Sequence, residues 1–163
     1  MERTILHVDC NSFYASVECF LNPAIRCFPA AVCGDVENRH GVILAKNELA
    51  KRHKVATGDA VWQAQKKCPG LVCIPAHFDR YLRFSRMARA IYEDYTDRVE
   101  PFGLDECWLD LSGPGADGIR TAQEIRRRMK SEVGITVSIG VSFNKIFAKL
   151  GSDLRKPDAV TVI

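Results

Sequence analysis

Three acidic residues at the ends of apolar, strand-like segments are the side chains of this sequence best suited to catalysis. Asp9 follows the apolar run 5–8, while Asp105 and Glu106 follow a second run that ends near Gly103. Carboxylates that converge from distant parts of a chain can hold Mg²⁺ against phosphate groups. Phosphoryl transfer needs charge neutralisation and alignment more than covalent chemistry from the protein. The sequence therefore predicts a metal site for phosphoryl transfer at these three acids.

The local backbone decides whether the acids share one site. A fully extended strand would send Asp105 and Glu106 to opposite faces, so both can serve one site only if the chain turns there. Gly103 makes such a turn plausible. Asp110 is an equally good acid by composition, and periodicity does not exclude it. An aspartate at a strand end is also commonly a turn former or a helix cap, which is the competing structural interpretation.

The composition is that of an ordinary globular domain. The 163 residues are 47% hydrophobic and 26% charged, with a formal net charge of +3. Segment 117–163 is more basic, with nine Lys or Arg against five Asp or Glu. Such a cluster suits either a polyanion or a solvated helix face. Five of the nine fall in the predicted helix 118–133, namely Arg120, Arg126, Arg127, Arg128 and Lys130.

Cysteine usage and hydropathy point to a reducing, aqueous environment. The seven cysteines form no CxxC pair and no zinc-type cluster with histidine, which argues against a disulfide scaffold or a zinc site. Most are expected to be small core residues. No apolar run approaches the length of a membrane span, and the first strand leaves no room for a targeting peptide. The expected location is cytoplasmic.

Alternating strands and helices predict a layered α/β or α+β domain. Ser12 is a plausible helix N-cap, and Trp62 and Trp108 have positions suited to core packing. The last predicted strand ends the sequence in an apolar run, so further chain is expected after Ile163. Strands are expected at 4–9, 30–34, 42–45, 72–75, 98–102, 107–111, 136–141 and 160–163, helices at 12–20, 47–54, 59–68, 78–95, 118–133 and 144–154, and a polar turn at 35–41.

Several motifs, taken together and in order, resemble the Y-family of translesion DNA polymerases, especially its bacterial members. The similarity extends over essentially the whole sequence, from an opening motif at 7–18 to a lysine–proline pair near the end. The motifs are 7–18, 41–47, 78–81, 104–106, 138–142, 144–149, Ser152-Asp153 and Lys156-Pro157.

The resemblance implies an α+β polymerase palm, a mixed or antiparallel sheet covered by helices, at 1–19 and 78–163. A small inserted fingers subdomain would occupy 20–77, and the thumb and little-finger domains would lie beyond 163. It further implies two Mg²⁺ ions, with Mn²⁺ as a substitute, and primer–template DNA and deoxynucleoside triphosphates as partners. A sliding clamp would bind through a region outside this chain, and no membrane would be involved.

The resemblance also implies roles for individual residues. Asp9 and Asp105 would each touch both metal ions, and Glu106 would bind the ion at the primer terminus. Cys10 would offer its backbone carbonyl to a metal ion. Asn11 stands where such bacterial members often carry Asp; it is not one of the three expected metal-binding acids, and with Cys10 it joins the expected nucleotide-binding residues.

The nucleotide contacts follow from the same resemblance. Phe13 would pack beneath the incoming nucleotide, and Tyr14 would be the steric gate that excludes a ribose 2′-hydroxyl. Lys156 matches the phosphate-binding lysine. Lys51 and Arg52 are the expected cations of the fingers. Glu48 departs from the family's usual Tyr, and Lys51 from its usual Arg, so Lys51 would act as a point charge without a bidentate fork.

The implied function is template-directed addition of deoxynucleotides to a primer, including past lesions, by two-metal phosphoryl transfer. The isolated 163 residues are expected to be weakly active or inactive. A nucleotidyl cyclase-like palm is one alternative, against which Tyr14, the inserted subdomain and the lack of a GGDEF-like run argue. A non-catalytic module of polymerase shape is another, and the presence of all three acids argues against it. In both alternatives the layered α+β fold would remain.

Overall fold

The computed structural model describes residues 3–34 and 41–163. The chain forms two compact units, which are Met1–Asn11 with Leu82–Ile163 (unit 1) and Ser12–Tyr81 (unit 2). Unit 1 is therefore discontinuous in sequence, and unit 2 is inserted into it. The palm and fingers boundaries predicted from the sequence stay predictions, and the turn expected at 35–41 lies, except for Gly41, outside the described residues.

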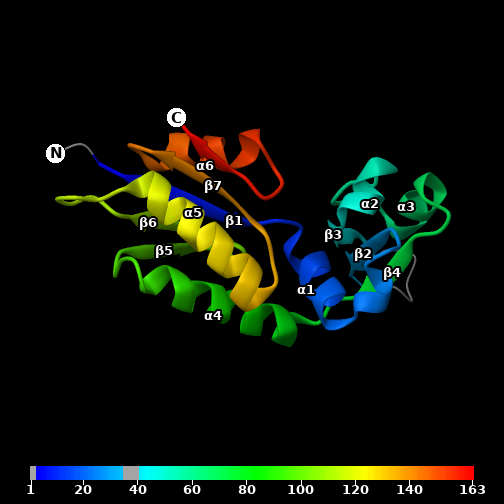
Figure 1. Ribbon diagram of the computed structural model, residues 1–163. Helices are drawn as coiled ribbons and strands as arrows, with labels where there is room; N and C mark the ends of the chain where they lie inside the picture. Colours follow the sequence, from blue (N-terminus) through cyan, green and yellow to red (C-terminus); the bar gives the residue numbers. More distant parts are fainter. Residues whose placement is uncertain (1–2, 35–40) are drawn as a thin grey trace. The chain divides into compact units, whose positions relative to one another are not determined.

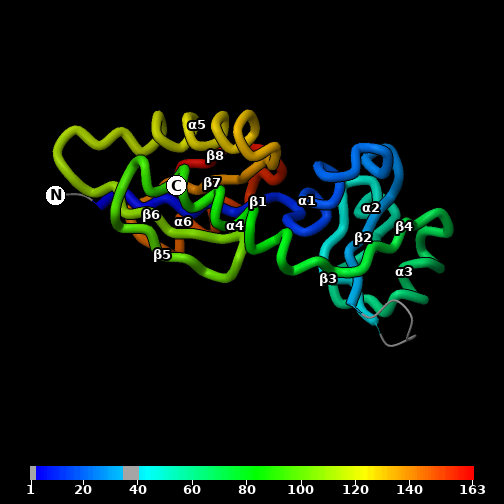
Figure 2. The backbone as a smooth tube through the Cα atoms, turned by 90° about the horizontal axis from the view of Figure 1, so that it is seen from below, coloured from blue at the N-terminus to red at the C-terminus, as the bar shows by residue number. Residues whose placement is uncertain are grey.

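Unit 1 is built on a mixed five-stranded sheet with the order β5-β6-β1-β7-β8. The central strand β1 is antiparallel to both of its neighbours, and β7 and β8 are parallel. Because both of its faces are covered, every residue of β1 is buried, and β1 runs through the middle of the unit (Figures 1 and 2). The strands are β1 (Ile5–Cys10), β5 (Val99–Phe102), β6 (Glu106–Asp110), β7 (Val137–Ser142) and β8 (Val160–Val162).

The alternation of side chains along β1 assigns the two faces of this sheet. Cys10 approaches Tyr92 of α4, so its face of the sheet meets that helix. The opposite face, with His7 and Asp9, meets α6, because His7 Nδ1 lies 2.8 Å from Ser152 Oγ. The helical segments are α4 (Phe78–Glu93), which continues from unit 2, α5 (Gly118–Arg128), a π-helical turn (Met129–Val133) and α6 (Lys145–Leu154).

Unit 2 carries its own three-stranded sheet with the order β3-β2-β4. Strand β2 is antiparallel to β3 and parallel to β4. Its apolar cluster includes Ile43, Ala50, Val61 and Ala64, which come from β3 and two short helices. The elements are α1 (Phe13–Leu21), a 3₁₀ turn (Pro23–Ile25), β2 (Ala30–Cys33), β3 (Ile43–Lys46), α2 (Glu48–Arg52), α3 (Val61–Lys67) and β4 (Val72–Pro75).

The α+β class and the order of elements agree with the sequence prediction, with boundaries that differ by a few residues. The predicted helix 118–133 is α-helical to Arg128 and then continues as the π-helical turn. The seven cysteines all lie in the described ranges as free thiols, and five of them are buried. In the part of the chain that the structure describes, no helix has the length and apolar character needed to span a membrane.

Three predictions of local structure need correction. Ser12 stands at the N-cap position of α1, but it adopts φ 47°, makes no capping hydrogen bond through its side chain, and has a buried hydroxyl oxygen with no hydrogen-bond partner among the described residues. Trp62 is 55% exposed and so is not a core residue. Trp108 is half-buried and donates its indole N–H to the Lys145 carbonyl. Both tryptophans follow an apolar pattern, but each falls at the edge of its unit's core.

Candidate active site

The structure brings the backbones of the three predicted acids together at one end of the unit 1 sheet. Asp9 and Glu106 are direct partners in the β1–β6 register. The next residue of β1, Cys10, donates its backbone N–H to the Asp105 carbonyl at 2.9 Å. Gly103 has φ 71°, a left-handed backbone that glycine adopts readily, and it begins the bend expected from the sequence. Distant segments thus meet here through sheet pairing.

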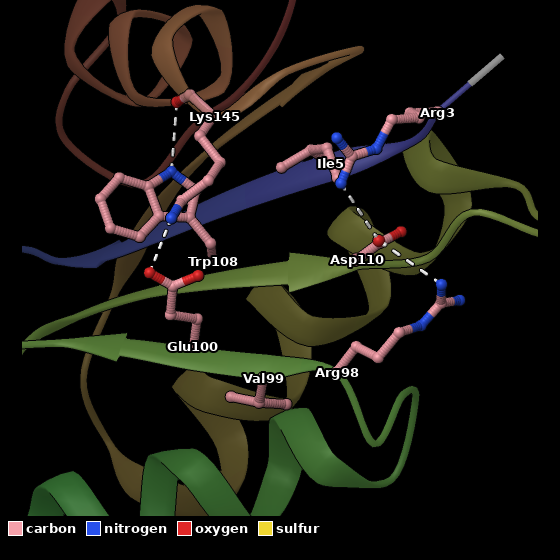
Figure 3. Close-up of a pocket in the computed structure, with 8 residues that line it drawn as sticks. All are labelled: Arg3, Ile5, Arg98, Val99, Glu100, Trp108, Asp110 and Lys145. Carbon is pink, nitrogen blue, oxygen red and sulfur yellow. Dashed lines mark hydrogen bonds and ion pairs between the residues drawn. The ribbon is translucent and has the colours of Figure 1, made fainter.

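Asp110 lies away from these acids, although it is on the same strand as Glu106. It pairs with Ile5, four positions along the register from the Asp9 pair. Its carboxylate accepts a hydrogen bond from Ser112 N at 2.8 Å and lies 3.4 Å from Arg98 and 3.6 Å from Arg3. Figure 3 shows these cations around Asp110, beside a cavity of about 270 Å³. Asp110 is therefore a structural ion-pair partner at the far end of β6.

Lysine side chains neutralise two of the three acids. Lys156 Nζ lies 2.6 Å from Asp9 Oδ2 and 2.8 Å from an oxygen of Asp153. Lys149 Nζ, on α6, lies 2.5 Å from Glu106 Oε1. The proximity of Lys156 to Asp9 fits a residue that meets phosphate beside the acids. The sequence does not predict that Lys149 pairs with Glu106, because this contact depends on how α6 packs on the sheet.

Burial and like charge shift the ionisation of the acids. Burial, helped by the neighbouring Glu106 charge, raises the pKa of Asp9 above its usual range, although Lys156 opposes the shift. Burial and the same glutamate also raise the pKa of Asp105. Burial lowers the pKa of Lys156, but its paired carboxylates outweigh that effect and the net pKa is raised. A cation that binds this end of the sheet would relieve the repulsion among the acids.

The donor chemistry of these acids fits Mg²⁺ or Mn²⁺, since carboxylate oxygens are the hard ligands that such ions prefer. In the arrangement described here, no three acidic, histidine or cysteine side chains of residues 3–34 and 41–163 converge closely enough to hold an ion. Asp9 and Glu106 are instead paired with the ammonium groups of Lys156 and Lys149. The metal ligands therefore remain a prediction.

His7 lies beside the acids, although the sequence predicts no role for it. It is completely buried, two positions before Asp9 and on the same face of β1. Its Nδ1 lies 2.8 Å from Ser152 Oγ, and its Nε2 lies 3.9 Å from Glu106 Oε1. Burial and the charge of Lys149 lower the pKa of His7 to about 4, so the ring is neutral at pH 7. Strand alternation alone could have placed His7 beside Asp9, on the same face of β1.

Cys10 and Asn11 contribute to the fold of unit 1 through their side chains. The Cys10 thiol is buried, 3.9 Å from the Tyr92 hydroxyl, and burial raises its pKa well above the usual range. Asn11 is 6% exposed, and its amide makes hydrogen bonds to Ser138 and Thr136. Neither side chain is presented to solvent, and the role of the Cys10 carbonyl stays a prediction.

The predicted steric gate belongs to an aromatic cluster in unit 2. The Tyr14 ring stacks on Tyr81 with centroids 4.2 Å apart and planes at 13°, and Phe78 meets it edge-on at 5.8 Å. Phe13 is buried beside them, with its ring centroid 5.7 Å from that of Tyr14. Tyr14 itself is half-buried. The cluster gives Tyr14 a fixed orientation, as a gate would require.

A buried carboxylate supports this aromatic cluster. Glu18 is 3% exposed and accepts a hydrogen bond from the Tyr81 hydroxyl at 2.7 Å. Arg80 donates to its other oxygen at 2.8 Å, and His77 Nδ1 lies 2.8 Å from the first. Glu18 ends the opening motif 7–18, but the sequence predicts no role for it, because its partners lie about sixty positions away.

The predicted fingers cations lie on α2 in unit 2. Lys51 is exposed, and its Nζ pairs with Glu48 Oε1 at 2.8 Å. Arg52 is exposed beside it. Glu48, the departure noted in the sequence, thus neutralises the cation that was expected to meet phosphate.

The basic residues of α5 and the following turn are partly paired within unit 1. Arg126 and Lys130 contact Asp158 at 2.7 and 3.3 Å. Arg128 pairs with Asp94 and Glu132 at 2.9 and 2.7 Å. A solvated helix face, one of the two interpretations of this cluster, is thus only part of the description, because these three cations also form ion pairs with other residues of unit 1.

Comparison with known proteins identifies the family. The profile of the impB/mucB/samB family matches residues 8–153. The chain belongs to this family. Within it, DNA polymerase IV of Acetivibrio thermocellus is 61% identical over 166 residues, which cover 100% of this chain and 42% of the relative. DNA polymerase IV 1 of Bacillus subtilis is 41% identical over 163 residues, which cover 99% and 39%.

Solved structures of family members confirm the predicted Y-family resemblance and palm-type fold. The crystal structure of DinB from Sulfolobus solfataricus matches with a TM-score of 0.93 and 29% identity over 98% of this chain and 48% of that one. The insertion ternary complex of Dbh DNA polymerase matches with a TM-score of 0.92 and 30% identity over the same shares. The chain spans about half or less of the length of these family members.

Proposed function

We propose that this chain is the catalytic part of a translesion DNA polymerase that adds deoxynucleotides to a primer by two-metal phosphoryl transfer. The supporting observation is the Asp9–Glu106 register pair, with Asp105 on the adjoining bend and Lys156 beside Asp9. Relatives named DNA polymerase IV support the same activity. Carboxylates beside an ammonium group suit the binding of a metal-complexed triphosphate.

Two Mg²⁺ ions, or Mn²⁺ in their place, would be held by the carboxylates of Asp9, Asp105 and Glu106 and the Cys10 carbonyl. Bound there, such ions neutralise phosphate charge and lower the pKa of a coordinated hydroxyl. Asp9 and Asp105 would each bind both ions, and Glu106 would bind the ion at the primer terminus. Lys156 would move from Asp9 to the triphosphate.

Four more residues are proposed contacts of the incoming nucleotide. Tyr14 would exclude the ribose 2′-hydroxyl, Phe13 would support it, and Lys51 and Arg52 would meet phosphate. Primer–template DNA and deoxynucleoside triphosphates would be the substrates. A sliding clamp would bind outside these 163 residues, and the protein would work in the bacterial cytoplasm.

Primer extension by the full-length protein tests this function. With Mg²⁺, primer–template DNA and deoxynucleotides, we expect Asp105→Ala to lower the extension rate by at least about 1,000-fold, because it removes a carboxylate at the site of charge development. Binding to DNA, measured by fluorescence anisotropy, should change little. Asp110→Asn is the matched control, since it alters an acid of the same strand away from the site, and it should retain activity.

Two outcomes would contradict the proposal. An active Asp105→Ala enzyme would remove that acid from the site. Cyclic nucleotide formed from a triphosphate without DNA, together with no primer extension, would favour a cyclase-like palm instead.

A further inference from the structure

A buried amide fastens the loop that carries Lys156 to the sheet of unit 1. Asn11 Oδ1 accepts the backbone N–H of Asp158 at 2.9 Å and the Thr136 hydroxyl at 3.0 Å. The amide nitrogen of Asn11 donates to Ser138 Oγ at 2.8 Å. One side chain thus joins the end of β1, the strand β7 and the loop two positions after the lysine.

Cations of the α5 region hold the same loop from its other side. Arg126 Nε donates to the Asp158 carboxylate at 2.7 Å and to its carbonyl at 3.0 Å, and Lys130 lies 3.3 Å from the carboxylate. Burial raises the pKa of Asp158, but these donors outweigh it and the net pKa is lowered, so the pair is ionised at pH 7. Asp158 has φ 54°, a left-handed conformation that residues other than glycine seldom adopt. The contacts therefore stabilise a backbone that is unfavourable by itself.

The two ends of the loop are also fixed. Ile139 donates its backbone N–H to the Ala159 carbonyl at 2.8 Å, where the loop enters β8. At the other end, α6 finishes at Leu154. Between these anchors Lys156 reaches Asp9 and Asp153. The direction of Lys156 thus depends on the anchored backbone as well as on its own ion pairs.

We propose that Asn11, Arg126 and Asp158 are positioning residues that aim Lys156 at the triphosphate. This rests on the proposed function of Lys156. In this proposal Asn11 acts by holding the loop that carries Lys156, and not by direct contact with the nucleotide. Arg126 affects substrate binding in the same way, although it lies on α5, which carries none of the three acids. None of the three residues touches the substrate, so each acts through the lysine.

Steady-state kinetics of the full-length protein provide the first test. Arg126→Ala should raise the KM for the deoxynucleotide about tenfold with kcat within about twofold, because a misplaced cation weakens binding in the ground state and transition state alike. Arg126→Lys keeps one donor for Asp158 and should restore most of the affinity. Arg127→Ala is the matched control, since its neighbouring side chain on α5 is exposed, and it should behave as the wild type.

A second measurement needs neither DNA nor nucleotide. Under limiting acetic anhydride, mass spectrometry gives the acetylation rate of Lys156 relative to Lys66, an exposed lysine of unit 2. Arg126→Ala and Asn11→Ala should each raise this ratio several-fold, because the freed loop exposes the ammonium group. Asn11→Asp keeps the acceptor oxygens and should leave the ratio near that of the wild type, as should Arg127→Ala.

The two measurements separate failure of this inference from failure of the proposed function. If the wild-type protein extends no primer, the polymerase proposal fails, and the acetylation ratios still decide whether the loop is held as described. If Arg126→Ala and Asn11→Ala leave both KM and the ratio unchanged, the positioning role is overturned. Should circular dichroism show that Arg126→Ala is unfolded, the comparison of Asn11→Ala with Asn11→Asp decides.

Discussion

Tyr14 shows how neighbouring side chains can fix the orientation of a single ring. Its stack on Tyr81 leaves one ring face covered, and Glu18 holds the Tyr81 hydroxyl from the buried side. A stacked ring pair contributes stabilisation beyond the area that it buries. A gate must resist displacement by a hydroxyl group, so an aromatic ring supported in this way suits the role proposed for Tyr14.

The gate can be tested by removing the ring. In the full-length protein, Tyr14→Ala should lower the preference for deoxynucleotides over ribonucleotides by at least about tenfold, because a steric clash worth roughly 1.4 kcal/mol or more is lost. Tyr14→Phe keeps the ring and should preserve the preference. Single-nucleotide incorporation with both kinds of triphosphate measures the ratio. Unchanged sugar discrimination in Tyr14→Ala would reject the assignment.

At the level of residues, the sequence predicted the acids but not their partners. Asp9 and the Asp105–Glu106 pair stand at strand ends, which is a local property that can be read along the chain. The pairing of Lys149 with Glu106 depends on how α6 crosses the sheet, and no sequence period encodes that crossing. Asp110 could be separated from the other acids only by the β1–β6 register.

The packing of α6 on β7 depends on a glycine. A Cβ added to Gly140 would lie 1.8 Å from the Ala148 carbonyl oxygen and 2.6 Å from Ser152 N, both backbone atoms of α6. The helix could accept a side chain there only by moving away from the sheet. Because α6 carries Lys149 and leads into the Lys156 loop, this close approach also sets where both lysines lie.

We therefore expect Gly140→Ala to lower the free energy of unfolding of unit 1 by about 3 kcal/mol or more, as for severe overpacking. Urea denaturation followed by circular dichroism measures the change. Gly113→Ala is the matched control, because a Cβ there meets no described atom within 4 Å, and it should stay within about 0.5 kcal/mol of the wild type. A Gly140→Ala protein of normal stability would mean that α6 packs less closely than described.

The elements themselves were largely predictable, because strand alternation and helical periodicity are local signals. The two elements that differ from the prediction, at Val133 and at Ser12, do so because of local backbone conformation that the sequence pattern does not reveal. The helix expected to run to Val133 changes to a π-helical turn after Arg128, before Gly134 at φ 78°. Ser12 has a residue type that commonly caps helices, but it adopts a left-handed backbone between β1 and α1, which composition does not reveal.

On the scale of the whole molecule, the chain folds as two compact units, each of which contains one of the two tryptophans. Trp108 belongs to unit 1 and Trp62 to unit 2. The resemblance stated from the sequence predicts an inserted subdomain at 20–77. The observed units divide at Asn11 and Tyr81, within segments whose sequence shows no change in composition, so the division depends on tertiary contacts.

The two tryptophans allow the pH dependence of each unit to be followed separately. The buried ring of His7 in unit 1 has a pKa near 4, below its ordinary value of 6.5. Between these values the unfolded chain binds a proton at His7 that the folded unit does not, so the contribution of His7 to the stability of unit 1 falls as the pH decreases. From pH 7 to pH 5 this contribution amounts to about 2 kcal/mol.

Urea denaturation of a Trp62→Phe variant with and without His7→Gln, followed by Trp108 fluorescence at pH 7 and pH 5, isolates this loss, because the raised pKa values of Asp9 and Asp105 contribute with the opposite sign in both proteins. Adding His7→Gln should remove it, because glutamine fills similar space without titrating, and the difference between the two proteins should therefore shrink at the lower pH. Trp62 fluorescence in a Trp108→Phe variant reports unit 2, where His7→Gln should have little effect. If the free energies of unfolding of the two proteins differ by the same amount at pH 7 and pH 5, the His7 ring is protonated as easily in the folded protein as in the unfolded chain, and the prediction is wrong.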